Sequence, residues 1–238
     1  MRLPFAPLPL LVLLALLLLL AVVVQLGALT LAFDKLGLSP GSAIILLVAS
    51  LLGSVVNLPL FRVRADDARD GGGRATQGAV AEHPPPDSMP PRWRRLLRLP
   101  ERPFTGWTVI AVNAGGCLVP VAFSFYLLMH NPPPAWQVLV AVGGVTALSH
   151  LISRPLPGIG IGMPPLVAPL AAALIAILLG GEHGPALAYV GGTLGVLIGA
   201  DLLRLGDIRK IGTPFASIGG AGTFDGIFIT GIIAVLLA

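Results

Sequence analysis

Residues 185–203 read PALAYVGGTLGVLIGADLL, and residues 204–210 follow with RLGDIRK. The first stretch carries no charge before Asp201. A helix needs about 20 predominantly apolar residues to cross the roughly 30 Å of a bilayer's hydrocarbon core. The second stretch places Arg204, Arg209 and Lys210 directly beyond this segment, and short basic segments of this kind stay in the cytoplasm. The two stretches together predict a transmembrane helix that ends at the cytoplasmic surface.

Apolar segments of similar length recur along the chain. Their continuous apolarity, without alternation, favours helices over membrane strands. We therefore predict an all-α polytopic membrane protein, a helical bundle of about seven transmembrane helices with a disordered cytoplasmic loop. The predicted spans are residues 8–33, 41–60, 107–130, 136–152, 160–179, 185–203 and 222–238.

The basic residues set the predicted orientation. Of the fifteen Lys and Arg residues, all but Lys35 lie at the N-terminus or in every second gap between the segments. Because Lys and Arg are retained in cytoplasmic loops, the N-terminus is predicted to be inside and the C-terminus outside. The last segment is the weakest, since its apolar run begins only at Gly226, and a re-entrant or partial span is the alternative.

The composition excludes a soluble domain of ordinary type. Hydrophobic residues make up 55% of the 238-residue chain, charged residues 11%, and the mean hydropathy is +0.90. The net charge of +4 arises beside membrane segments, so it indicates anionic headgroups rather than nucleic acid. Cys117 is the single cysteine and cannot form an intrachain disulfide. The Ala- and Arg-rich composition suits a bacterial cytoplasmic (inner) membrane.

Three regions follow from the segment pattern. Residues 1–61 form a predicted two-helix membrane hairpin, residues 62–104 a cytoplasmic Arg/Pro/Gly-rich loop, and residues 105–238 a five-helix membrane domain. Most of the loop is predicted to be disordered, because it has too few large apolar residues to form a core. Residues 91–99 read PRWRRLLRL and predict an interfacial helix. The arginines expected to bind anionic lipid there are Arg92, Arg94, Arg95 and Arg98.

Asp201 and Asp225 are the acidic residues expected inside spans, where an ionisable side chain is costly and usually functional. In the simpler interpretation Asp201 reaches the headgroup region, or it pairs with Arg204 or Lys210. Asp225 then lies in the first turn of its helix, where the helix dipole favours a carboxylate. In the alternative, the two carboxyls on consecutive antiparallel helices share one proton and activate water against a peptide bond.

Small residues predict close helix packing in the 185–203 segment. Gly191, Gly195 and Gly199 recur every fourth residue and form a ridge on which another helix can pack. Asp201 is about 200° around a regular helix from Gly199. If the last helix packs on this ridge, Asp201 cannot face Asp225.

The most broken apolar stretch is residues 155–169, PLPGIGIGMPPLVAP. Pro164 and Pro165 prevent regular helical bonding, and irregular backbone at membrane depth is tolerated where it lines a watery cavity or is buried in protein. We therefore predict either a ligand pathway along this broken helix or a plain kinked helix. His150 and Arg154, four residues apart just before it, either bind an anionic group or serve as a cytoplasmic anchor.

Two resemblances add to these patterns. Residues 220–229, GAGTFDGIFI, resemble the Gly-x-Gly-Asp region of presenilin and signal-peptide-peptidase-type aspartyl proteases, with Gly222 matched but Phe224 in place of the second glycine. That resemblance implies a catalytic pair, Asp201 and Asp225. The stretches HLISRPLPGIG, GADLL, GDIRK and GTFDGIF together resemble a family of prokaryotic multi-pass membrane proteins named domain of unknown function sixteen-fourteen. This family implies a membrane location and no defined activity.

The sequence leaves three functions open. The first is binding or movement of a small ligand or lipid through residues 155–169. The second is a membrane aspartyl protease that uses Asp201 and Asp225, although enzymatic activity is not the favoured interpretation. The third is a non-enzymatic membrane scaffold or assembly factor. Because the four histidines and one cysteine are scattered, no metal site and no cofactor are predicted, and the sequence identifies no protein partner.

Overall fold

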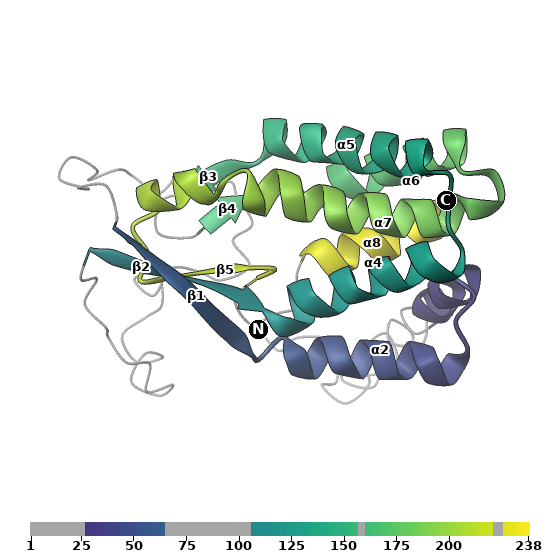
Figure 1. The fold of residues 1–238 in the computed structure, drawn as a ribbon, viewed down its shortest axis with the longest axis horizontal. Coiled ribbons are helices and arrows are strands. Elements are labelled where there is room, and N and C mark those ends of the chain that lie inside the picture. Colours follow the sequence, from purple (N-terminus) through teal and green to yellow (C-terminus); the bar gives the residue numbers. More distant parts are fainter. Residues whose placement is uncertain (1–26, 65–105, 157–159, 221–225) are drawn as a thin grey trace, which may run out of the picture.

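Helices fill one end of the molecule and strands gather at the other, as the computed structural model shows in Figure 1. The structure describes residues 27–64, 106–156, 160–220 and 226–238. The first predicted span therefore lies mostly outside the described residues. The predicted disorder of the long loop, the interfacial helix at 91–99 with its four arginines, and Asp225 also lie outside them.

The chain alternates between the helical end and the strand end. A helix at Gly27–Lys35 precedes the numbered elements. The helices are α2 (Pro40–Gly53), α4 (Val119–His130), α5 (Ala135–Ile152), α6 (Val167–Leu179), α7 (Gly184–Val196) and α8 (Gly226–Leu237). Two π-helical segments, η2 (Ala114–Leu118) and η4 (Leu197–Leu202), and two 3₁₀ segments, η3 (Gly181–His183) and η5 (Leu205–Lys210), adjoin them. The strands are β1 (Asn57–Arg64), β2 (Trp107–Asn113), β3 (Arg154–Leu156), β4 (Gly160–Gly162) and β5 (Phe215–Ile218).

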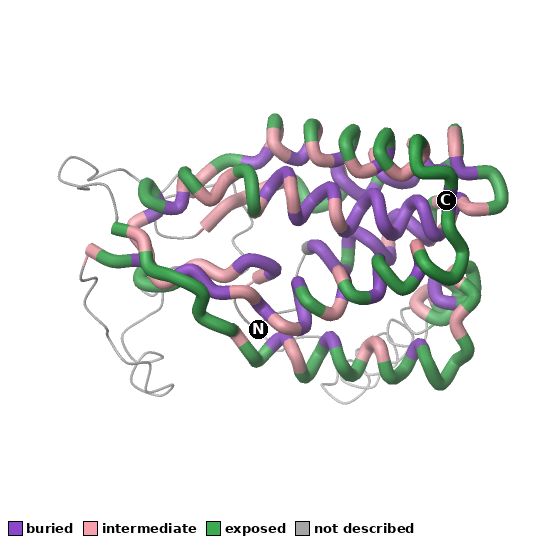
Figure 2. The backbone as a smooth tube through the Cα atoms, viewed as in Figure 1, coloured by how far each residue is buried: buried purple, intermediate pink, exposed green. Residues whose placement is uncertain are grey.

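Helix α7 is the central element of the bundle. It packs against α4, α5, α6 and α8, and Figure 2 shows it as an almost continuously buried tube. Tyr189, at the middle of α7, is fully buried and meets the Phe123 ring edge to face at 4.9 Å. The sequence 185–203 thus folds into the core that organises the other helices.

Helices α5 and α6 expose large apolar side chains on their outer faces. Alanines dominate the buried positions of α6, including Ala168, Ala172 and Ala176, whereas its Leu174 and Leu178 are exposed. The outer face of α5 likewise exposes Leu139 and Leu151. Large apolar residues outside and small residues inside are typical of helices that pack closely within lipid. This arrangement supports a membrane location.

The described residues contain two helices long and apolar enough to cross a membrane, Ala135–Ile152 and Gly181–Leu202. A third is possible if Gly27–Lys35 and Pro40–Gly53 act as one span, but they are bent by 111°. Other apolar helices are shorter, at Ala114–His130, Val167–Leu179 and Ile227–Leu237. The fold is mostly helical, and the prediction of about seven spans goes further than these lengths support.

Strands replace parts of three predicted helices, so the all-α prediction is wrong in that respect. Helix α2 ends at Gly53, and β1 takes up the rest of the predicted span 41–60. Pro59 explains the change, because it lacks the N–H that a continuing helix would require. The predicted span 107–130 begins as β2, whose β-branched Val109, Ile110 and Val112 suit a strand. In the predicted span 160–179, the helix begins only at Val167.

The principal sheet joins the N-terminal and C-terminal parts of the chain. Its strand order is β1-β2-β5, with β1 antiparallel and β5 parallel to β2. The register pairs Asn57 with Asn113 and Arg64 with Trp107. Strands β3 and β4 form a separate two-stranded hairpin at the same end of the molecule (Figure 1). The predicted broken helix at 155–169 is wrong, because its described residues form this hairpin and the start of α6.

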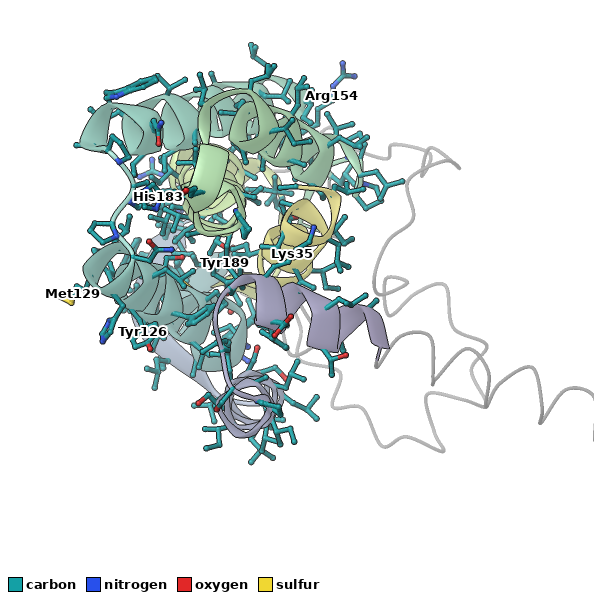
Figure 3. The ribbon with its side chains drawn as sticks, turned by 90° about the vertical axis from the view of Figure 1, so that its right-hand side faces the viewer. Lys35, Tyr126, Met129, Arg154, His183 and Tyr189 are labelled. Atoms are coloured by element: carbon teal, nitrogen blue, oxygen red, sulfur yellow. The ribbon has the colours of Figure 1, made fainter. Side chains whose placement is uncertain are left out.

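Charge is segregated between the two ends. The described basic residues of β1, β3 and η5 lie at the strand end, which we call the basic end: Arg62, Arg64, Arg154, Arg209 and Lys210. Lys35 and His183 lie at the opposite end, the one that faces the viewer in Figure 3. The Nζ atom of Lys35 lies 3.4 Å from the carbonyl oxygens of Val235 and Leu236. The C-terminal helix therefore finishes at the end opposite the basic end.

Candidate functional site

Asp201 lies in η4, where the central helix changes from α to π geometry. Each π turn takes in an extra residue and rotates the side chains that follow, and such segments are frequent at functional sites. The Oδ2 atom of Asp201 accepts a hydrogen bond from the N–H of Gly219 at 3.0 Å. The ion pair with Arg204 or Lys210 that the simpler interpretation allowed does not form, because both of those cations bind Asp207.

Gly219 brings a third element to this place. Its φ of +81° is a left-handed conformation that favours glycine. A Cβ atom at this position would lie 2.6 Å from Cβ and 2.7 Å from N of Cys117, in η2. Asp201, Gly219 and Cys117 therefore meet where the two π-helical segments approach the end of β5.

Asp225 lies outside the described residues, so its distance from Asp201 stays a prediction. The helix that follows it, α8, begins at Gly226 and packs against both α7 and η2. Gly219, which binds Asp201, is only six residues before Asp225. The chain thus leads from the Asp201 contact directly to the segment that carries the second carboxyl.

The glycine ridge of α7 meets α5 and not α8. A Cβ atom at Gly191 would lie 3.0 Å from Cβ of Ala141, and one at Gly195 would lie 2.5 Å from Cβ of Val145. Gly199 is pressed against the backbone of α5 at Thr146. The α5 contact uses the ridge, so the geometric objection to an approach between Asp201 and α8 does not apply.

Arg204 holds the end of α5, a role that sequence reasoning missed. One guanidinium nitrogen, Nη2, donates to the carbonyl oxygens of His150 at 2.5 Å and Ser153 at 2.9 Å. Nε lies 3.2 Å from the hydroxyl of Ser153, and Nη1 binds Oδ2 of Asp207 at 3.0 Å. A cation at the C-terminus of a helix satisfies its free carbonyls and complements its dipole. The only sequence signal was an arginine directly after a span.

Asp207 is neutralised by its two neighbours. Its Oδ1 atom binds Nζ of Lys210 at 2.7 Å, while Oδ2 binds Arg204. The hydrogen bonds from Lys210 and then Arg204 lower the pKa of this carboxyl below its ordinary value. Asp207 therefore stays ionised and holds the Arg204 guanidinium in its orientation.

His150 and Arg154 do not form a common site. The Nδ1 atom of His150 lies 3.3 Å from the carbonyl oxygen of Gly199, in η4. Arg154 begins β3 and is exposed, and Figure 3 shows its side chain projecting from the periphery. Pro164 and Pro165 are exposed between β4 and α6. The structure thus separates the four residues that the sequence grouped as a ligand pathway.

An open hollow of about 420 Å³ lies between the principal sheet and η5. Phe61, Val63 and Ile110 form its sheet wall, and Leu205, Gly206 and Arg209 form the opposite wall. Among the described residues, Arg209 forms no ion pair, in contrast to Arg204 and Lys210 on either side of it in the chain. The hollow therefore combines apolar walls with one available cation. Sequence reasoning missed it because the predicted helix 41–60 took in the start of β1, and Val63 was assigned to the cytoplasmic loop that begins at residue 62.

Two asparagines tie the sheet to α2 and η2. The amide Nδ2 of Asn113 donates to the carbonyl oxygen of Ser54 at 2.6 Å and to Oδ1 of Asn57 at 3.1 Å. Ser217 donates to the same Asn57 oxygen at 2.6 Å. This network fixes the strand end against the bundle, so it positions both the hollow and the Asp201 contact.

A family model described as "Protein of unknown function (DUF1614)" matches residues 51–237, most of the chain. The chain belongs to this family. The match covers all five strands, the central helix α7 and both π-helical segments. No curated protein and no solved structure matches the chain. Membership in DUF1614 therefore identifies the family and leaves the function to be argued from the geometry.

Proposed function

We propose that this DUF1614 protein binds an anionic amphiphile in the hollow at its basic end. The observation that carries the proposal is the pairing of apolar walls with Arg209. A phosphate-bearing lipid of the surrounding leaflet has the required chemistry, a charged head joined to apolar chains. The proposed binding site for a ligand or lipid is therefore this hollow, and not the pathway predicted along residues 155–169.

The size and walls of the hollow fit part of such a molecule. Its volume of about 420 Å³ falls within the roughly 300–1,000 Å³ of typical ligand pockets. Phe61 is 48% exposed, whereas Ile110 is 1% exposed. An apolar chain lying on Phe61 would bury surface that lacks a protein partner, while the head reaches Arg209.

Native mass spectrometry of the full chain in detergent tests the proposal. The protein would be titrated with phosphatidylglycerol and, separately, with phosphatidylcholine. We expect tighter binding of the anionic lipid and a loss of that preference in Arg209→Gln. Arg154→Gln is the matched control, since Arg154 is a basic residue at the same end that does not line the hollow. Equal phosphatidylglycerol binding by Arg209→Gln and the unmodified protein would refute it.

A membrane aspartyl protease is the second candidate. The contact between Asp201 and Gly219 favours it, because it holds a carboxylate beside the segment that leads to Asp225. Two carboxyls that approach closely share a proton and divide the roles of base and acid. Peptide hydrolysis by the purified protein that persists in the double variant Asp201→Asn, Asp225→Asn would remove this candidate.

A further inference from the structure

The principal sheet has a second face that carries arginine and aromatic side chains. Residues paired across neighbouring strands project to the same side of a sheet. Arg62 pairs with Val109, which pairs with Phe215, and Arg64 pairs with Trp107. These residues form two adjacent rows on one side, which we call the Arg–Trp face. The opposite side carries Phe61, Val63 and Ile110 and lines the hollow.

The Arg–Trp face has little covering it within the described residues. Trp107 is 50% exposed and Phe215 is 40% exposed, and both arginines are exposed. The described residues supply no carboxylate partner to Arg62 or Arg64. Tryptophan beside arginine is the composition found where proteins meet lipid headgroups, since the ring is amphipathic and the guanidinium binds phosphate.

We propose that the Arg–Trp face lies on the anionic leaflet at the basic end of the bundle, with Trp107 and Phe215 among the headgroups. Two observations select the leaflet as its occupant. The charge is complementary, because Arg62 and Arg64 meet anionic lipid without competition from acidic side chains on this face. The depth also fits, because β1 continues from α2 through exposed Leu58 and Leu60 to the two arginines.

The other end of the molecule supplies a reference for depth. Trp136, the second residue of α5, is 55% exposed at the end opposite the basic end. Helix α5 has 18 residues and therefore spans about 27 Å, close to a hydrocarbon core. Tryptophans are enriched at both membrane interfaces, so Trp136 marks the interface opposite the basic end. This inference does not depend on ligand binding in the hollow.

Fluorescence quenching by brominated lipids tests it on the full chain in nanodiscs. In the variant Trp93→Phe, Trp136→Phe, Trp107 is the only tryptophan. We expect lipids brominated near the glycerol backbone to quench Trp107 more strongly than lipids brominated deep in the chain. Brominated phosphatidylglycerol should quench it more than brominated phosphatidylcholine. In Arg62→Gln with Arg64→Gln this preference should fall, by up to about fivefold for each arginine removed.

The controls separate the leaflet from other occupants. The variant Trp93→Phe, Trp107→Phe reports on Trp136, which should be quenched at a similar depth but without dependence on the two arginines. If that tryptophan background does not fold, a spin label at Phe215→Cys in a Cys117→Ala background measures the same depth through its accessibility to oxygen and to a polar nickel complex. Quenching of Trp107 by aqueous acrylamide but by no brominated lipid would overturn the proposal. A spin label at position 215 that is accessible to the nickel complex but poorly accessible to oxygen would also overturn it. Lipid quenching that disappears at high protein-to-lipid ratio would also overturn it, in favour of a second copy.

Discussion

Substitution of Gly195 by alanine should loosen the contact between α7 and α5. Gly195 is buried on α7, and its added Cβ would lie 2.5 Å from Cβ and 2.7 Å from Cγ1 of Val145. Val145 is itself fully buried, and the same new atom would lie 3.2 Å from the backbone N of Thr146. Neither partner can move without shifting α5, so the two helices must separate.

The expected loss of stability follows from two opposing terms. Extra atoms in a packed core typically cost about 1–3 kcal/mol. Alanine in place of a helical glycine recovers up to about 1 kcal/mol. The net loss for Gly195→Ala should therefore lie between about 0 and 3 kcal/mol, with a midpoint of about 1.5 kcal/mol. Gly143→Ala is the matched control, because Gly143 is exposed on α5 and no atom lies within 4 Å of its added Cβ. It should be neutral or stabilising by up to about 1 kcal/mol.

Both variants would be unfolded reversibly in mixed micelles by raising the fraction of denaturing detergent. Circular dichroism follows the loss of helix and gives the free energy of unfolding. We expect the Gly195→Ala midpoint to fall and the Gly143→Ala midpoint to stay level or rise. Equal stability of the two variants would refute the packing argument. A scaffold function, which depends on this contact, would show the same ranking in any cellular phenotype.

Further predictions concern the basic end. Gly219→Ala should be destabilising by about 1–3 kcal/mol in the same assay, whereas Gly206→Ala, with no atom within 4 Å of its added Cβ, should be close to neutral. Arg204→Met should lower the thermal midpoint in detergent, because three bonds to the α5 terminus are lost. The pKa of Asp207 is lowered in the folded protein. The ionised carboxyl therefore adds to the free energy of unfolding above the unfolded pKa of about 4, and this stabilisation is lost as the pH falls through the lower folded pKa. Asp207→Asn should remove that part of the acid dependence below about pH 4, and an unchanged acid profile would contradict the role assigned to the Arg204–Asp207 pair.

The sequence predicted the family and the regular helices well. The spans at 136–152 and 185–203 correspond to α5 and to α7 with η4, because each is a long apolar run without proline in its interior. Composition also indicated the membrane, and the side-chain distribution supports it. The grouping of basic residues at one end was visible from the positions of Arg154, Arg204 and Arg209 alone.

The strands could not be predicted from periodicity. Residues 57–60 and 107–113 are as apolar as a buried helix, and a short apolar run does not distinguish the two structures. What decides them is pairing between β1 and β2 across more than forty residues, fixed by the hydrogen bond between Asn113 and Asn57. The hollow depends on that pairing, so it was missed as well. The π geometry that directs Asp201 to Gly219 is likewise a tertiary effect.

A membrane-spanning bundle requires the basic end and the opposite end to lie on different sides of the membrane. Two single-cysteine variants in a Cys117→Ala background test this requirement. One carries its cysteine at Gly206 in the basic end and the other at Glu182 in the opposite end. The labelling of each by a membrane-impermeant maleimide is measured. In intact bacterial cells with a permeabilised outer membrane, Glu182→Cys should be labelled at once and Gly206→Cys only after lysis. Labelling of both positions from one side would contradict a membrane-spanning bundle, and the reverse order would contradict the prediction that the basic end is cytoplasmic.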